Sequence, residues 1–241
     1  ILIITGRNKK NIEDFFDYTP ELDAVLEENA QEDFLKLSRA MENMADIYFV
    51  RQKHPVGFAD AVMYAKPFTG DEPFGILLGD DIIYTNSTQK PGIRQLADSY
   101  ERTGKTTVAL MQVEDKDIPK YANVHGEMLN EKLCRIDQIV EKPRIEQKFS
   151  NDAVIGRYVV GPKIYDFIKE TPPSQKGEVY FTDALGLLAA EGQLHGYRFD
   201  GLRYDAGNKL DYLKANIEFA LRDPKLAKGL REYLTELTKT L

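Results

Sequence analysis

The sequence Phe74-Gly75-Ile76-Leu77-Leu78-Gly79-Asp80-Asp81 is an apolar run of strand length that ends in a glycine and two aspartates. In open α/β sheets, ligands bind in the crevice beyond the carboxyl ends of the strands. Asp80 and Asp81 would stand at that end of such a strand. The stretch therefore predicts both a strand, 74–78, and an acidic ligand-binding edge.

The residues on either side of this run alternate between strand and helix patterns. We expect strands at 1–5, 46–52 and 106–113, and helices at 8–18, 21–44, 58–65 and 92–102. Repeated βα units of this kind indicate a parallel sheet with helices on both faces.

The middle of the chain changes character, because strand-like runs follow one another with only turns and charges between them. These runs are 124–127, 133–140 and 153–160. Helices are expected at 163–170 and 182–191, a strand at 194–199, and two closing helices at 210–222 and 224–241. We predict one α/β domain over 1–241, with a Rossmann-like mixed, mostly parallel sheet, helices on both faces and a small antiparallel insertion.

Composition narrows the class of protein. The 241 residues carry a formal charge of −7, which argues against a general nucleic-acid binder but not against an anionic small molecule. No segment approaches the roughly 18 uninterrupted apolar residues that a membrane helix needs. The single cysteine, Cys134, cannot build a disulfide framework and is expected in the core of a cytoplasmic protein. His54, His125 and His195 lie in separate segments without metal-ligand spacing, so structural roles are expected for them.

Two acidic motifs are candidates for a metal site. Asp80 ends the run quoted above, and Asp205 lies in Tyr204-Asp205-Ala206-Gly207-Asn208, after the strand expected at 194–199. Mg²⁺ favours oxygen ligands and often uses one or two carboxylates together with substrate phosphates. The alternative for each motif alone is a solvated turn, since aspartate and glycine are common turn residues.

Two further motifs are candidates for substrate contacts. In Val140-Glu141-Lys142-Pro143, an extended chain would point Glu141 and Lys142 to opposite sides, and the lysine would suit a phosphate. In Arg51-Gln52-Lys53-His54-Pro55-Val56-Gly57, the Gln52 amide suits a base edge, and Gly57 allows close backbone approach before a helix. An ordinary sheet edge and an ordinary loop are the respective alternatives.

Taken in order, these motifs resemble the bacterial UTP–glucose-1-phosphate uridylyltransferase (UDP-glucose pyrophosphorylase) family of nucleotidyltransferases, from residue 1 to about residue 222. Besides the four motifs above, the resemblance includes Ile3–Asp17, Gly70–Phe74, Ile155–Tyr158, Thr171–Pro173 and Phe181–Ala184. It implies a fold of the nucleotide-diphospho-sugar transferase type. It also implies synthesis of UDP-glucose and pyrophosphate from UTP and glucose 1-phosphate with Mg²⁺.

The resemblance also implies a role for individual residues. Asp80 and Asp205 would hold Mg²⁺ and act in catalysis together with Lys142, which would bind the sugar phosphate. Gln52 and Gly57 would contact the uracil. Further contacts on the sugar side would come from Glu141, Gly156 and, near the sugar or the metal, Asp81.

Some features of the family are expected outside these residues or differ here. The glycine-rich phosphate loop, Gly-x-Gly-Thr-Arg followed by a lysine, should precede residue 1. Ala122-Asn123 stands where a Tyr-Gly pair is expected, and Phe58-Ala59-Asp60 replaces a more usual Leu-Gly-His/Asp. These differences affect a substrate contact and the stiffness of the chain near the base.

Other functions remain open on the sequence alone. A sister thymidylyl- or cytidylyltransferase differs in a few base contacts, and a non-catalytic sugar-nucleotide-binding module would result if the phosphate loop were truly absent. A dinucleotide-binding enzyme would show Gly-x-Gly-x-x-Gly, which does not occur. The amphipathic segment 224–241 packs on its own core or forms a homo-oligomer contact, as the family resemblance implies.

Overall fold

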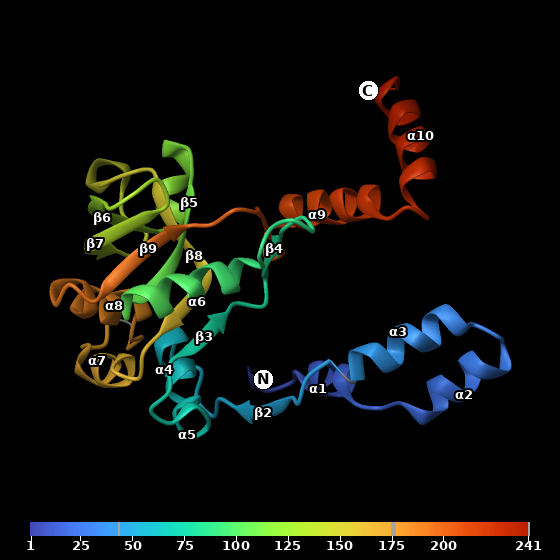
Figure 1. Cartoon of the computed structure of the whole chain (residues 1–241), viewed down its shortest axis with the longest axis horizontal. Coiled ribbons are helices and arrows are strands. Elements are labelled where there is room, and N and C mark those ends of the chain that lie inside the picture. Colours follow the sequence, from blue (N-terminus) through green and yellow to red (C-terminus); the bar gives the residue numbers. More distant parts are fainter. Residues whose placement is uncertain (43, 175–176, 241) are drawn as a thin grey trace. The chain divides into compact units, whose positions relative to one another are not determined.

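The computed structural model describes residues 1–42, 44–174 and 177–240 of the chain (Figure 1). The chain divides into two compact units. The first contains Ile1–Glu72 and Pro162–Ala184, and the second contains Pro73–Gly161 and Leu185–Leu241. Whether these units act as the one domain expected from the sequence stays a prediction, and residue 241 of that expected domain lies outside the described residues.

The first unit is built around a parallel pair of strands. β1 (Leu2–Thr5) pairs with β2 (Tyr48–Arg51) in parallel register. The helices of this unit are α1 (Lys10–Phe16), α2 (Pro20–Glu28), α3 (Glu32–Glu42), α4 (Phe58–Met63), α5 (Lys66–Thr69) and α7 (Ile164–Glu170). α4 packs against α7, so the segment that follows β2 is held by a helix from later in the chain.

The single long helix expected over 21–44 is wrong, because the structure has two helices there, α2 and α3. α2 ends in a Schellman motif, in which Ala30 N–H donates to Glu27 O at 3.1 Å and Gln31 N–H to Leu26 O at 2.9 Å. Ala30 takes the left-handed backbone conformation, with φ +52°, at the position usually filled by glycine. Alanine is a strong helix former, so the end of α2 at Ala30 could not be recognised in the sequence.

The second unit contains a six-stranded mixed sheet in the order β3-β8-β5-β9-β7-β6. Its strands are β3 (Phe74–Leu77), β5 (Thr106–Gln112), β6 (Ala122–Met128), β7 (Leu133–Val140), β8 (Asp152–Val160) and β9 (Leu194–Arg198). The strands expected in this region are thereby confirmed. α6 (Gly92–Thr103) covers one face of the sheet, where Leu96 packs with Ala109, Ile155 and Val159 (Figure 1).

The mixed α/β fold is confirmed, but the sheet is less parallel than expected. Only β5 and β9 are parallel neighbours among the described strands of this sheet, whereas β8 runs antiparallel to both β3 and β5. β8 lies between β3 and β5 in the strand order. The antiparallel segment is therefore part of the central sheet and not a small insertion beside it.

A short antiparallel ribbon, which the sequence pattern did not predict, follows the acidic turn. β4 (Asp81–Tyr84) pairs with β10 (Leu202–Asp205), and Asp81 stands opposite Asp205. α9 (Lys209–Arg222) begins just after β10, with Asn208 as its N-cap, and α10 (Ala227–Thr238) follows. The remaining elements are α8 (Phe181–Ala190) and the short 3₁₀ turns Asp115–Lys120 and Ile145–Gln147.

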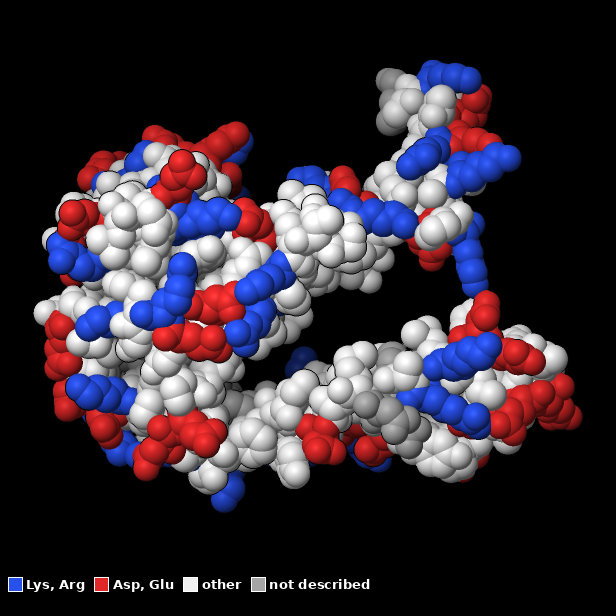
Figure 2. Space-filling view, in the orientation of Figure 1, with Lys and Arg blue, Asp and Glu red and all other residues white. Residues whose placement is uncertain are grey.

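The surface carries charges of both signs. Figure 2 shows acidic and basic side chains interspersed on its visible face, including over α6, where Lys90 and Arg94 pair with Asp98. None of the described helices has the length and apolar character needed to cross a membrane. Cys134 is buried, and its burial raises the pKa of the thiol to about 11, as suits the core residue expected from the sequence.

The end of α2 generates a stability prediction. Replacing Ala30 by glycine removes the steric cost of the left-handed conformation, partly offset by the greater freedom of glycine in the unfolded chain. We expect Ala30→Gly to raise the free energy of unfolding by about 0.5–1 kcal/mol. Urea unfolding measures the change. Ala24→Gly, at an exposed position in the middle of α2, is the matched control and should destabilise the protein, and a destabilising Ala30→Gly would contradict the helix end described here.

Acid should weaken the fold through His195. This buried side chain has no hydrogen-bond partner for Nδ1 among the described residues, and burial, assisted by Lys105 and Arg135, lowers the pKa of His195 below 6.5. The unfolded chain therefore binds the proton more readily. Stability is fully present above about pH 6.5 and is lost as the pH falls through the lower folded pKa. Urea unfolding from pH 8 to pH 5 should show a smaller acid loss in His195→Leu, whereas exposed His54→Gln should match the parent protein.

Candidate active site

Asp80 and Asp205, the two predicted metal ligands, lie together in the second unit. Asp80 occupies the turn between β3 and β4, and Asp205 ends β10. Ala206 N–H donates to Asp80 O at 2.7 Å, which joins the two acidic segments through their backbones. The β4–β10 ribbon therefore explains how residues so distant in sequence meet.

The carboxylates of the two aspartates converge on Gly207. A Cβ atom at Gly207 would stand 3.1 Å from Asp205 Oδ1 and 3.3 Å from Asp80 Oδ2. A side chain here would crowd both carboxylates, so glycine leaves open the space that they share. Two carboxylates suit Mg²⁺, whose other ligands are commonly waters and substrate phosphates. Within the described ranges, no group of three or more His, Cys, Asp or Glu side chains forms a further metal cluster.

Asp81, expected near the sugar or the metal, is buried and turned toward the protein. Its Oδ2 accepts the Gly156 N–H at 2.5 Å, and its Oδ1 accepts from Arg203 Nε at 2.5 Å. Both carboxylate oxygens thus have protein partners. Asp81 connects β4 to β8 and β10, and its contact with a substrate stays a prediction.

Gly156, expected to line the sugar side, lies in β8 against the acidic turn. A Cβ atom there would stand 2.5 Å from Asp81 Oδ2 and 2.7 Å from Leu78 Cβ. Because neither neighbour is the free end of a flexible side chain, glycine is required for this close approach. The structure thus gives Gly156 a packing role, while its contact with the sugar stays a prediction.

Two arginines that the sequence motifs did not assign hold this acidic region together. Arg157 Nη1 donates to Leu78 O at 3.0 Å, and its Nη2 donates to Asp81 O, so its guanidinium fixes the turn that carries Asp80. Arg203 contacts Asp81 and Asp205 from β10. A signal existed for Arg203, because residues two apart in a strand face the same side.

Burial and charge act differently on these two arginines. Burial lowers the pKa of Arg157, although the Asp81 carboxylate acts against this change. Burial is the largest single effect on Arg203 and works against its charge, but Asp81, Tyr121 and Asp205 together outweigh it, so the pKa of Arg203 is raised. Arg203 also donates to Tyr121 Oη at 2.8 Å. Both arginines are charged at neutral pH, so Asp81 is a compensated buried carboxylate.

Glu141 and Lys142 follow β7, and the backbone at Lys142 is not extended. Lys142 has φ +43°, a left-handed backbone that is uncommon outside glycine. Its Nζ lies 3.8 Å from Glu141 Oε1, so the two side chains do not point to opposite sides. Lys142 N–H donates to Tyr121 O at 3.1 Å, and Tyr121 also binds Arg203. This turn is therefore tied to the acidic region through Tyr121.

Gln52 and Gly57, the predicted uracil contacts, line one cavity of about 460 Å³ in the first unit. The other residues lining it are Pro55, Val56, Gly177 and Glu178. Its volume lies within the usual range for small-molecule sites. Gly57 has φ +121°, and a Cβ atom there would stand 2.6 Å from Glu178 Cγ. Glu178 is a further lining residue that the sequence motifs did not assign, and the contact of Gln52 and Gly57 with uracil stays a prediction.

The Gln52 side chain is oriented by its neighbours. Gln52 Nε2 donates to Asp60 Oδ2 at 2.6 Å and to Gly57 O at 3.3 Å. Among the described residues, none donates to Gln52 Oε1, so this oxygen remains available as an acceptor. Asp60 is thus a further residue of this cavity region that the sequence motifs did not assign to the base.

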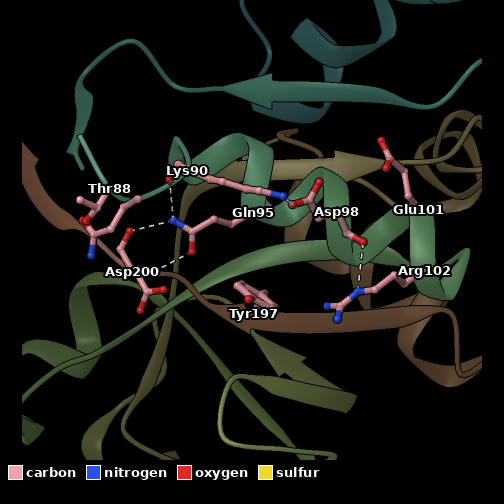
Figure 3. A pocket seen from close by; sticks show the side chains of 9 residues that line it. Thr88, Lys90, Gln95, Asp98, Glu101, Arg102, Tyr197 and Asp200 are labelled. Atoms are coloured by element: carbon pink, nitrogen blue, oxygen red, sulfur yellow. Dashed lines mark hydrogen bonds and ion pairs between the residues drawn. The ribbon is translucent and has the colours of Figure 1, made fainter. Parts of the chain in front are cut away.

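A second cavity, of about 560 Å³, lies beside α6 in the second unit (Figure 3). Three of its charged side chains pair within the cavity: Lys90 with Asp98 at 2.5 Å, and Arg102 Nε with Asp98 O at 3.2 Å. Gln95 Nε2 donates to Lys90 O and Asp200 O, each at 2.8 Å. The converging carboxylates therefore make the acidic region a better candidate than this cavity for phosphate chemistry.

Comparisons with known proteins agree with this geometry. A nucleotidyl transferase family model matches residues 5–221. A UTP–glucose-1-phosphate uridylyltransferase of Staphylococcus saprophyticus is 38% identical over 99% of this chain and 82% of its own length. A UDP-glucose pyrophosphorylase structure from Acinetobacter baumannii has a TM-score of 0.90 at 30% identity, covering 98% of this chain and 82% of that one.

A second solved UDP-glucose pyrophosphorylase, complexed with UDP-glucose, has a TM-score of 0.82 at 33% identity, covering 92% of this chain and 81% of that one. The family model spans most of the chain, and the curated relative is similar along nearly all of it. The chain therefore belongs to the nucleotidyltransferases and, among them, to the UTP–glucose-1-phosphate uridylyltransferase family.

Proposed function

We propose that this chain makes UDP-glucose and pyrophosphate from UTP and glucose 1-phosphate, with Asp80 and Asp205 as the ligands of one Mg²⁺. The observation that carries this proposal is the convergence of the two carboxylates beside Gly207. When bound, the metal would neutralise charge on the phosphate oxygens. The similarity to UTP–glucose-1-phosphate uridylyltransferases supports UTP and glucose 1-phosphate as the substrates. The paired carboxylates support Mg²⁺ as the metal.

The chemistry is a phosphoryl-group displacement. An oxygen of the sugar phosphate forms a bond to the α-phosphorus of UTP, the bond between that phosphorus and the α,β-bridging oxygen breaks, and pyrophosphate leaves with the electron pair. The attacking phosphate is already ionised near neutral pH, so no general base is required. Catalysis therefore depends on holding two polyanions in line and offsetting their repulsion.

Lys142 and Glu141 are proposed to hold the sugar phosphate and the sugar hydroxyls, respectively. The Lys142 ammonium is a compact positive charge suited to a phosphate, and Glu141 offers carboxylate oxygens to hydroxyl donors. Both follow β7 and are tied through Tyr121 to the region of Asp205. Sugar contacts of Gly156 and Asp81 are part of the same proposal, although both residues also have the structural contacts described above.

Gln52 supports a preference for a base with an imino N–H. Its Nε2 donors are occupied by Asp60 and Gly57, so Oε1 is presented as an acceptor. Uracil and thymine carry a donor at N3, whereas cytosine carries an acceptor there. This orientation favours UTP or dTTP over CTP, so the sister thymidylyltransferase is the alternative that a nucleotide comparison must separate.

An assembly of like chains and a cytoplasmic location stay predictions. α10 buries none of its residues against this chain and exposes Tyr233 and Leu237, which leaves an apolar surface of the kind that chain association covers. This favours the oligomer contact over packing on the chain's own core for the segment 224–241, of which residue 241 lies outside the described part. The single cysteine supports a reducing compartment.

The first prediction from this function concerns Asp80. Asp80→Asn removes one metal carboxylate while conserving shape, and several kcal/mol of lost charge stabilisation corresponds to a turnover at least about 100-fold lower. Pyrophosphate release from UTP and glucose 1-phosphate with Mg²⁺ measures it, with EDTA as the metal-free reference. Asp166→Asn, an exposed change in α7, should leave turnover intact. Near-normal turnover in Asp80→Asn would exclude the metal assignment.

A second prediction concerns Gln52 and the base. Gln52→Ala removes one acceptor, and the lost hydrogen bond should raise the KM for UTP by about tenfold at nearly constant kcat. The preference for UTP over CTP should fall in the same variant. Steady-state kinetics with UTP, dTTP and CTP measure both effects, with the exposed Gln138→Ala change on β7 as control. An unchanged nucleotide preference would remove Gln52 from the base site.

A further inference from the structure

Arg203 lies between Asp81 and Asp205 in the second unit. It lies on β10, two residues before Asp205, and only 8% of its side chain is exposed. Its guanidinium contacts the carboxylates of Asp81 and Asp205 and donates to the hydroxyl of Tyr121. Neither the sequence motifs nor the proposed substrate contacts give this buried side chain a role.

We propose that Arg203 is a positioning residue that turns the Asp205 carboxylate toward Asp80, so that both carboxylates meet one divalent cation. This inference rests on the proposed function, because it requires a metal between the two aspartates. Arg203 would act only through Asp205 and would touch neither the metal nor a substrate.

The two oxygens of Asp205 have different partners, which fixes the rotation of the carboxylate. Oδ2 lies 3.2 Å from Arg203 Nη2, whereas Oδ1 accepts the Gly207 N–H at 3.0 Å. It is Oδ1 that stands beside the space shared with Asp80 Oδ2 at Gly207. With Oδ2 held by arginine, Oδ1 is the oxygen presented to that space.

The guanidinium is itself fixed, so it can set the orientation of a neighbour. Asp81 accepts from Arg203 Nε at 2.5 Å, and Tyr121 Oη accepts from Nη1 at 2.8 Å. The Tyr121 ring also lies 5.3 Å from the guanidinium carbon, within cation–π range. All three nitrogens of the planar group therefore have partners, and rotation of Arg203 would break several contacts at once.

Charge supports the same role. Asp80 and Asp205 carry like charges that repel at short range, and this repulsion favours side-chain rotations that separate them. Arg203 places a positive charge on the side of Asp205 that faces away from the shared space, and so offsets part of the repulsion. Partners behind a metal ligand commonly change metal affinity by about 10–100-fold when they are mutated.

Arg203→Lys tests the inference, because lysine retains the charge but cannot contact three partners in one plane. Mn²⁺ binding to the intact chain is measured from the EPR signal of free Mn²⁺ with UDP-glucose present. We expect Mn²⁺ to bind about 10–100-fold more weakly in the variant. In turnover assays, the half-saturating Mg²⁺ concentration should rise in parallel, while the KM for glucose 1-phosphate changes little.

Arg198→Lys is the matched control. Arg198 forms a bidentate pair with Asp152, at 2.9 and 2.7 Å, in the same unit, and among the described residues it contacts neither proposed metal ligand. Its Mn²⁺ affinity should equal that of the parent protein. Unchanged Mn²⁺ binding in Arg203→Lys would overturn the inference, and so would an equal loss in both lysine variants, since that would reflect general loosening.

Tyr121→Phe decides the case if Arg203→Lys does not fold. This change removes only the hydroxyl that accepts from Arg203, so a smaller loss of Mn²⁺ affinity in the same direction is expected, and unchanged affinity would count against the inference. The parent protein is measured first. If it released pyrophosphate but bound no Mn²⁺, the metal assignment would fail, and if it released none, the proposed function itself would fail. Both results differ from a failure confined to Arg203.

Discussion

The buried carboxylate of Asp81 is the interaction on which the acidic region depends. One of its oxygens binds the backbone of β8 at Gly156, and the other binds Arg203 on β10. A buried carboxylate is costly unless it is paired and hydrogen-bonded, so both contacts are needed at this buried position. The short β4–β10 ribbon is thereby joined to the large sheet, and Asp80 and Asp205 take their positions from that junction.

Much of the fold could be predicted from the sequence because most elements carry a strong local pattern. The strands β5, β7 and β8 are long apolar or alternating runs, and the pattern of α6 is clearly helical. The site motifs were recognisable for a related reason. Asp80 follows β3 and Asp205 ends β10, and the pairing of β10 with β4 brings the two residues together although they are far apart in the chain.

What the sequence could not show depends on contacts between distant segments. The path of β8 between β3 and β5 is set by tertiary pairing, and nothing within the strand itself distinguishes a parallel from an antiparallel neighbour. Ala30 ends a helix in a conformation that alanine rarely adopts. Arg203 was given no role from the sequence, because its partners Asp81 and Tyr121 lie far from it in the chain.

The left-handed backbone of Lys142 affects which substitutions position 142 would accept. A left-handed conformation at a non-glycine residue costs of the order of 1–3 kcal/mol, and the surrounding contacts must hold it in place. Glycine or asparagine at this position would relieve that cost, so selection for heat resistance alone would favour them. Either replacement would discard the ammonium group. Under the proposed role of Lys142 in binding the sugar phosphate, position 142 is therefore a place where stability and activity make opposite demands on the side chain.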